Sequence, residues 1–158
     1  MYSTKYVKPN STTEALEAIK SLGEGKFLAG GMTLIPTLKQ RLASPDGLVD
    51  ISGCKLDSIA DEGETLKIGA MTRHVSVAES ALVKKAIPAL AKLADGIGDR
   101  QVRNRGTIGG SVANNDPSAC SPSAVLALNS FSYLDINQSR TKSRICFMSN
   151  LSKLWIAK

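Results

Sequence analysis

Two glycine pairs carry the residues best placed to do chemistry. Residues 28–34 read Leu-Ala-Gly-Gly-Met-Thr-Leu, and residues 107–116 read Thr-Ile-Gly-Gly-Ser-Val-Ala-Asn-Asn-Asp. Each pair is expected at the end of a strand, beside a hydroxyl residue, Thr33 or Ser111. Because glycine has no Cβ, its N–H groups can turn outward and approach an anion closely. A helix N-terminus adds positive partial charge. The pattern predicts two loops that together could hold both phosphates of a pyrophosphate-linked cofactor.

The spacing of these loops leaves the cofactor undecided. A single glycine pair after a strand is usually only a turn, and that interpretation weakens when two pairs have matching hydroxyl neighbours. The chain contains neither the G-x-x-x-x-G-K-[ST] phosphate loop nor the G-x-G-x-x-G dinucleotide fingerprint.

Other reactive residue types are sparse. His74 is the single histidine and is expected on the surface or in a loop, so no nucleophile–base pair and no catalytic residue is assigned. The three cysteines, Cys54, Cys120 and Cys146, form no C-x-x-C pair. They predict no disulfide framework and no metal site, and we expect Cys120 to be a buried small residue.

Charge points only weakly to a nucleic-acid partner. The net charge is +6, but residues 1–129 carry 15 basic against 13 acidic residues, and residues 130–158 carry five against one. This tail also holds four of the seven aromatic residues. A basic nucleic-acid binder is therefore only a third hypothesis. Arg100, Arg103 and Arg105 lie in an expected basic loop, where they could approach phosphates, meet a partner subunit or be solvated.

The elements that must position the first loop form a small parallel α/β unit. Ser11 to Glu14 is a capping box that opens a helix ending at Gly23. Strands are expected at residues 26–29 and 48–51. Between them, Thr33 should cap a second helix. Its inward-facing residues are expected to be Leu34, Ile35, Leu38 and Leu42.

The second half has a different pattern of expected elements. Short strands are expected within residues 59–68 around the turn at 61–64, followed by helices over 72–80 and 83–94 with a break or kink at Pro88. A further helix is expected at 124–128. We divide the chain into residues 1–54, 55–129 and a tail, 130–158. The tail is expected to form a strand near 131–136 and a helix near 150–157, outside the packed domain.

Several motifs in order resemble a known family. They are Ala29-Gly-Gly-Met-Thr33, Ile68-Gly-Ala-Met-Thr72, and the run from Arg103 through Thr-Ile-Gly-Gly-Ser to Asp116-Pro117. Over about residues 4–129 the chain resembles the FAD-binding medium subunits of the molybdenum hydroxylases, such as aerobic carbon monoxide dehydrogenase and xanthine dehydrogenase. The resemblance implies an α+β fold of two subdomains, as in vanillyl-alcohol oxidase-like (PCMH-type) flavoproteins, with FAD between them.

The resemblance also implies a function and a set of contacts. FAD would pass electrons from iron–sulfur clusters to an external acceptor, with a molybdenum cofactor-binding large subunit and an iron–sulfur small subunit as partners. The cofactor-binding positions carried over are Ala29, Gly30, Gly31, Met32, Thr33, Thr107, Ile108, Gly109, Gly110, Ser111 and Asp116.

Two departures from the family pattern leave an alternative open. Cys120 stands where the family usually has an acidic residue that helps to hold the flavin side of the cofactor. The resemblance is expected to stop near Asn129, which suggests a truncated or frameshifted chain. The alternative function is therefore a fragment or nucleotide-binding module without redox activity.

The composition and the apolar runs indicate where in the cell the chain is expected. Apolar residues make up 42% and charged residues 22%, as in ordinary globular proteins. No apolar run approaches the roughly 18 residues that cross a membrane, and no signal-peptide core is present. A reducing cytoplasm is the expected location.

Overall fold

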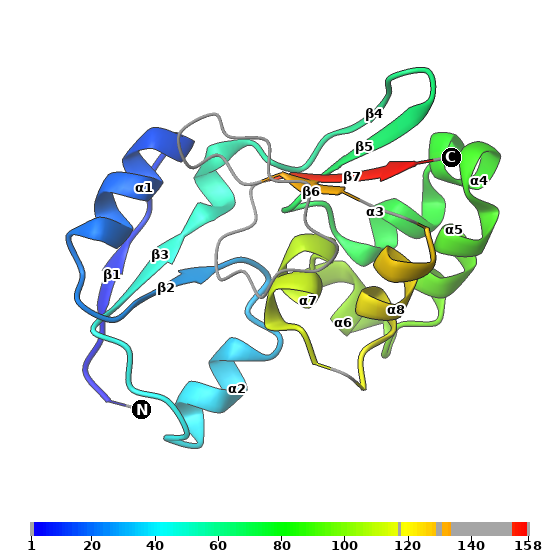
Figure 1. Ribbon diagram of the computed structural model, residues 1–158. Helices are drawn as coiled ribbons and strands as arrows, with labels where there is room; N and C mark the ends of the chain where they lie inside the picture. The colour runs from blue at the N-terminus through cyan, green and yellow to red at the C-terminus, as the bar shows by residue number, and fades with distance from the viewer. Residues whose placement is uncertain (1, 117, 129–130, 134–152, 158) are drawn as a thin grey trace.

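The computed structural model describes residues 2–116, 118–128, 131–133 and 153–157. It contains two sheets and flanking helices (Figure 1). One sheet has three parallel strands and the other has four antiparallel strands. The predicted α+β class, with a small parallel unit followed by an antiparallel sheet, is confirmed.

The parallel sheet is built from the first fifty residues. It has the order β1-β3-β2, from β1 (Lys5–Val7), β3 (Gly47–Asp50) and β2 (Gly25–Leu28). In this register Gly25 and Lys5 both pair with Gly47. Helix α1 (Thr12–Lys20) follows β1, and α2 (Leu34–Lys39) follows β2. A strand is thus followed by a helix twice, as the alternation of elements predicts.

Helix α1 begins as its capping residues require. The Ser11 side chain accepts a hydrogen bond from the backbone N–H of Glu14, at 3.2 Å. The Glu14 carboxylate accepts from the backbone N–H of Asn10, one residue before the cap. Both orphan donors find side-chain acceptors, so the helix start is fixed locally. Its buried Ala15 packs in a core cluster with Val49.

The antiparallel sheet has the order β4-β5-β7-β6. The strands are β4 (Ile59–Asp61), β5 (Thr65–Gly69), β7 (Lys153–Ala157) and β6 (Phe131–Tyr133). The first two form the predicted hairpin. Inside it, Leu66 and Ile68 are fully buried and form the centre of the larger core cluster.

The tail contributes two of these strands, and this corrects two expectations. Residues 153–157 form a strand paired with β5, so the predicted helix near 150–157 is wrong there. The edge of β5 on one side and β6 on the other supply the backbone partners of this short run. The expected strand is present at 131–133, and residues 134–136 lie outside the described residues. For the two strands, the expectation that the tail lies outside the packed domain is also wrong.

Six helices and one 3₁₀ turn complete the part of the chain that the structure describes. They are η1 (Ile51–Cys54), α3 (His74–Glu79), α4 (Ala81–Ala86), α5 (Pro88–Asp95), α6 (Arg100–Arg105), α7 (Ile108–Asn114) and α8 (Cys120–Ala127). Pro88 breaks the expected second helix, because it is the first residue of α5.

The expected basic loop at 100–105 is a helix instead. The Asp99 carboxylate accepts from the backbone N–H of Val102 at 2.8 Å and caps α6. Helix α8 begins four residues earlier than expected, at Cys120, with Pro122 in its first turn, where proline costs no hydrogen bond. In the described part of the chain, no helix is long and apolar enough to cross a membrane.

Candidate functional site

The two glycine segments meet between the parallel unit and the helices (Figure 1). A Cβ placed on Gly30 would collide with the carbonyl oxygen of Arg105 and lie 3.0 Å from Gly106 Cα. A Cβ on Gly110 would lie 3.5 Å from the Ala29 Cβ. Segments that are more than seventy residues apart in sequence are therefore in direct contact. The prediction that they come together is supported.

The first segment makes a turn with open donors. Gly31 has a φ of +74°, a conformation that favours glycine. The Gly31 carbonyl accepts from Ile35 N at 3.0 Å and starts α2. Among the described residues, no protein acceptor is recorded for the backbone N–H groups of Met32, Thr33 and Leu34. Met32 and Thr33 are also exposed. This is the donor set that an anion needs.

The Thr33 side chain does not cap α2, contrary to the prediction. It precedes α2, but its side chain makes no capping hydrogen bond, and its backbone is already helical. The Thr33 carbonyl accepts from the Thr37 hydroxyl at 2.9 Å. Leu42 lies beyond the end of α2 with 73% of its surface exposed, so it does not face inward. The Thr33 hydroxyl is left available at the turn.

The second glycine pair lies in the first turn of α7 rather than at the end of a strand. Thr107 caps this helix, and its side chain accepts from Gly110 N at 3.2 Å. The N–H of Ser111 donates to the Thr107 carbonyl, and that of Gly109 donates to the Ala70 carbonyl, both at 3.0 Å. Its donors are thus satisfied within the protein, unlike those of the first segment.

Close packing explains the glycine at position 109. Gly109 is buried, and a Cβ there would lie 2.6 Å from the Ala70 carbonyl oxygen and 2.7 Å from its Cα. The neighbouring Ile108 donates to the Thr72 carbonyl at 3.0 Å, and Thr107 forms an isolated antiparallel bridge with Arg73. Residues 106–109 are therefore fastened along residues 70–74.

Two buried polar side chains lie along the contact between residues 70–74 and residues 106–109. The Thr72 hydroxyl is buried and has no hydrogen-bond partner among the described residues. His74 is 4% exposed, so the expectation of a surface or loop histidine is wrong. Burial lowers the pKa of the His74 imidazole below its usual value. The sequence offered one signal for this: His74 lies only two residues after the Ile68–Thr72 motif that carries the resemblance.

The remaining predicted residues lie near the ends of α7 and α8. The Asp116 carboxylate is exposed and accepts from Ser118 N at 2.8 Å, which orders the turn before α8. Ser111 is partly exposed on α7. Cys120 is a free, exposed thiol at the start of α8, so the expected burial is wrong.

The arginines of α6 add positive charge beside the contact between the loops. The Arg103 guanidinium donates to the carbonyls of Ile97 and Gly98 at 3.2 and 2.9 Å. Arg100 and Arg105 are exposed. No ion pair is recorded for these three in the part of the chain that the structure describes. No group of three or more metal-ligating side chains occurs among the described residues either.

This arrangement fits a diphosphate-linked cofactor. The open N–H groups of residues 32–34, the exposed Thr33 hydroxyl and the neighbouring arginines are anion-binding groups. The tight packing of Gly30 on residues 105–106 fixes the turn that presents them. The first segment supplies the donors, and the second segment holds it in place.

Comparison with known proteins identifies relatives of this arrangement. Residues 2–151 match the family described as the FAD binding domain in molybdopterin dehydrogenase. The chain is 41% identical over 133 residues to the carbon monoxide dehydrogenase medium chain of Hydrogenophaga pseudoflava, covering 83% of this chain and 46% of that one. It is 39% identical over 125 residues to the glyceraldehyde dehydrogenase medium chain of Sulfolobus acidocaldarius, covering 78% and 44%.

A solved structure shares this fold. It is carbon monoxide dehydrogenase from Hydrogenophaga pseudoflava lacking the Mo-pyranopterin moiety of its cofactor, with a TM-score of 0.90 and 34% identity. The superposition covers 99% of this chain and 59% of that one. Because the family match reaches residue 151, the expectation that the resemblance stops near residue 129 is wrong. The chain spans about half the length of the relatives above.

Proposed function

The chain belongs to the family of FAD binding domains of molybdopterin dehydrogenases, and from this we propose that it holds FAD at the contact between its two glycine segments. The observation that carries the proposal is a set of backbone N–H groups, those of Met32, Thr33 and Leu34, with no recorded acceptor among the described residues. They are presented by a turn that packs on residues 105–106. The pyrophosphate is the group that matches these donors.

The predicted contact residues divide into two roles. Ala29, Gly30, Gly31, Met32 and Thr33 form the turn that would hold the phosphates. Thr107, Ile108, Gly109, Gly110 and Ser111 support that turn through α7, and Asp116 orders the chain before α8. Ser111 remains a proposed hydroxyl donor. No catalytic acid or base is needed, because bound FAD itself supplies the capacity to accept and release electrons.

We further propose that the chain is the flavin subunit of a molybdenum-containing oxidoreductase. Its partners would be a molybdenum cofactor-binding large subunit and an iron–sulfur small subunit, in the reducing cytoplasm. Supporting this, the described part of the chain offers no cluster of metal ligands of its own, and Cys54 and Cys120 are free thiols. The division into subdomains at residues 54 and 55 is part of the same proposal.

The test is titration of the purified full chain with FAD, followed by flavin fluorescence, for wild type and Gly30→Ala. The added methyl group collides with the Arg105 carbonyl and separates the two segments. We expect FAD binding in the wild type and at least about a tenfold weaker affinity in the variant, a change of roughly 1.4 kcal/mol.

Gly96→Ala is the matched control. A Cβ there would lie 3.5 Å from the Leu93 carbonyl oxygen, an ordinary contact, at the end of α5. Its affinity should equal that of the wild type. A folded wild-type chain that binds no FAD would instead favour a fragment without redox activity, and equal affinities in all three proteins would place the cofactor elsewhere.

A further inference from the structure

The His74 side chain is packed directly against the backbone of the second segment. A Cβ placed on Gly106 would lie 2.9 Å from His74 Cδ2 and 3.2 Å from its Nε2. The backbone N–H of His74 also donates to the Gly106 carbonyl at 3.1 Å. The imidazole and the Gly106 backbone are thus in close contact at the beginning of α3.

The same backbone also touches the first segment. The position of a Gly30 Cβ lies 3.0 Å from Gly106 Cα, and Arg105 contributes its carbonyl oxygen to that contact. Gly106 therefore contacts both the His74 ring and the turn that presents the open N–H groups. A displacement of the ring would be transmitted to Gly30 through one residue of backbone.

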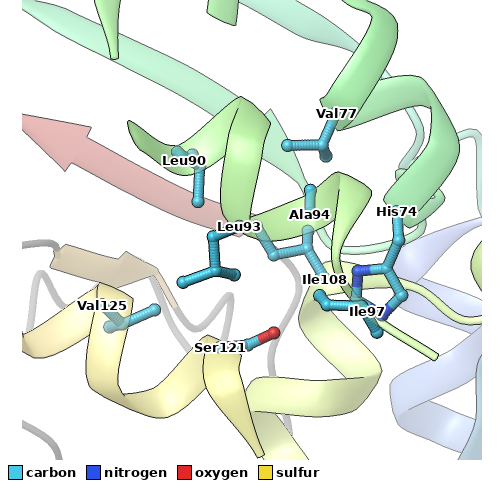
Figure 2. A pocket seen from close by; sticks show the side chains of 9 residues that line it. All are labelled: His74, Val77, Leu90, Leu93, Ala94, Ile97, Ile108, Ser121 and Val125. Atoms are coloured by element: carbon cyan, nitrogen blue, oxygen red, sulfur yellow. The ribbon is translucent and has the colours of Figure 1, made fainter. Parts of the chain in front are cut away.

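Among the described residues, the side chains that line the space beside the ring include no ionisable group other than His74 itself. Figure 2 shows the side chains that line the space beside His74, contributed by α3, α5, α7, α8 and the residue Ile97. All the others are apolar except Ser121, which is buried and carries a hydroxyl group. They are Val77, Leu90, Leu93, Ala94, Ile97, Ile108, Ser121 and Val125.

The charged groups of the neighbouring helices are exposed or bonded to other partners, and on α5 both Lys92 and Asp95 are exposed. On α6, Arg103 is bonded to the carbonyls of Ile97 and Gly98, and Arg100 and Arg105 are exposed. Arg73, the residue before His74 in the chain, is also exposed. A proton on the imidazole would therefore be buried without a counter-charge, which is costly.

We propose that His74 is a positioning residue for the cofactor site, and that its neutral imidazole holds residues 105–109 against the first glycine segment. This inference rests on the proposed function, since it concerns the same site. Protonation displaces the ring from its apolar surroundings, loosens the contact between Gly106 and Gly30, and so weakens FAD binding in acid.

The direction of the pH effect follows from burial. Because burial lowers the pKa of His74 in the folded chain, the neutral form contributes stability that is fully present above about pH 6.5, its unfolded value. That contribution is lost as the pH falls toward the lower pKa of the folded chain. Below the folded pKa, the apparent Kd for FAD should rise by up to about tenfold per pH unit.

The test compares FAD titrations of the full chain between neutral and mildly acidic pH for wild type, His74→Phe, His74→Gln and Val77→Ala. The first two variants remove the titrating group. Val77→Ala leaves a cavity in the same pocket without touching Gly106. Wild type and Val77→Ala should lose affinity in acid. At least one folded His74 variant should bind FAD equally at both pH values.

A second measurement is independent of FAD. Amide hydrogen exchange of Ile108 and Gly109, corrected for intrinsic rates, reports the bonds to Thr72 and Ala70. In the free wild-type chain these amides should lose protection in acid before those of β5 do, and in the folded His74 variants they should not. If the chain shows this exchange pattern but binds no FAD, the proposed function is contradicted, but the role of His74 in holding residues 105–109 is not. An identical pH dependence of affinity and exchange with and without His74 would overturn the inference.

Discussion

Replacing Gly31 with alanine tests whether FAD binding depends on the backbone conformation of the first turn. Gly31 has a φ of +74°, which costs an L-residue about 1–2 kcal/mol. A Cβ there would also lie 2.9 Å from Ile35 Cγ1. The variant can relieve the strain by rotating the turn, and this rotation would reorient the N–H of Met32. If binding requires the original backbone, FAD affinity should fall by that strain energy, about five- to thirtyfold.

Gly63 provides a control with nearly the same backbone. Its φ is +77°, it lies in the exposed turn between β4 and β5, and a Cβ there would meet nothing within 4 Å. Gly63→Ala should therefore lower the free energy of unfolding by about 1–2 kcal/mol through backbone strain alone. Its affinity for FAD should equal that of the wild type.

Two measurements on the full chain separate the effects. Denaturant unfolding without FAD gives the stability cost of each variant, and flavin fluorescence titration gives the dissociation constant. The reasoning is refuted if Gly31→Ala binds FAD as tightly as the wild type. It is refuted equally if both variants lose affinity in parallel, since stability alone would then explain the result.

Two further predictions concern positions where this chain departs from expectation. Cys120→Asp, at the exposed start of α8, should tighten FAD binding about ten- to a hundredfold if the carboxylate accepts a hydrogen bond from the cofactor. The control Cys120→Ser should change the affinity little. Equal affinities of all three proteins would place residue 120 away from the flavin. Ile156→Pro, opposite the buried Leu66 in the pairing of β7 with β5, should lower the free energy of unfolding by more than about 1 kcal/mol; unchanged denaturation would mean that β7 contributes nothing to the sheet.

The parts of the fold that depend on local signals could be read from the sequence. The capping box at Ser11 and Glu14 predicted the start of α1, and the turn at 61–64 predicted the hairpin of β4 and β5. In both places the stabilising contacts join residues close together in the chain. Pattern and structure therefore report the same interaction.

The errors occurred where distant partners or weak local patterns decide the structure. A short, mainly apolar run such as residues 153–157 is ambiguous between helix and strand, and its pairing with β5 and β6 resolves it. The arginine-rich stretch of α6 has almost no apolar periodicity, so its sequence favours a loop. Its one helix signal was Asp99, which caps it.

The candidate site shows a deeper limit, because a glycine does not reveal what approaches it. Both pairs were read as phosphate loops for the same reason, the absence of a Cβ. In the structure, Gly31 adopts a backbone that favours glycine beside open donors, whereas Gly109 makes room for Ala70. The first depends on conformation and the second on packing between two segments, and only the folded chain distinguishes them.

This difference changes how loss of flavin in a variant should be interpreted. A side chain at Gly109 would press on Ala70, and one at Gly110 would lie 2.8 Å from the Thr107 Oγ1 that caps α7. Either substitution would disturb residues 106–110 before any ligand is considered, so a colourless protein would not identify a phosphate contact there. Substitutions in the first segment are more informative, since the N–H groups of Met32, Thr33 and Leu34 have no recorded partner among the described residues. The phosphates should therefore be located with variants of the first turn. The role of the second segment should be measured by the effect of its variants on the free energy of unfolding.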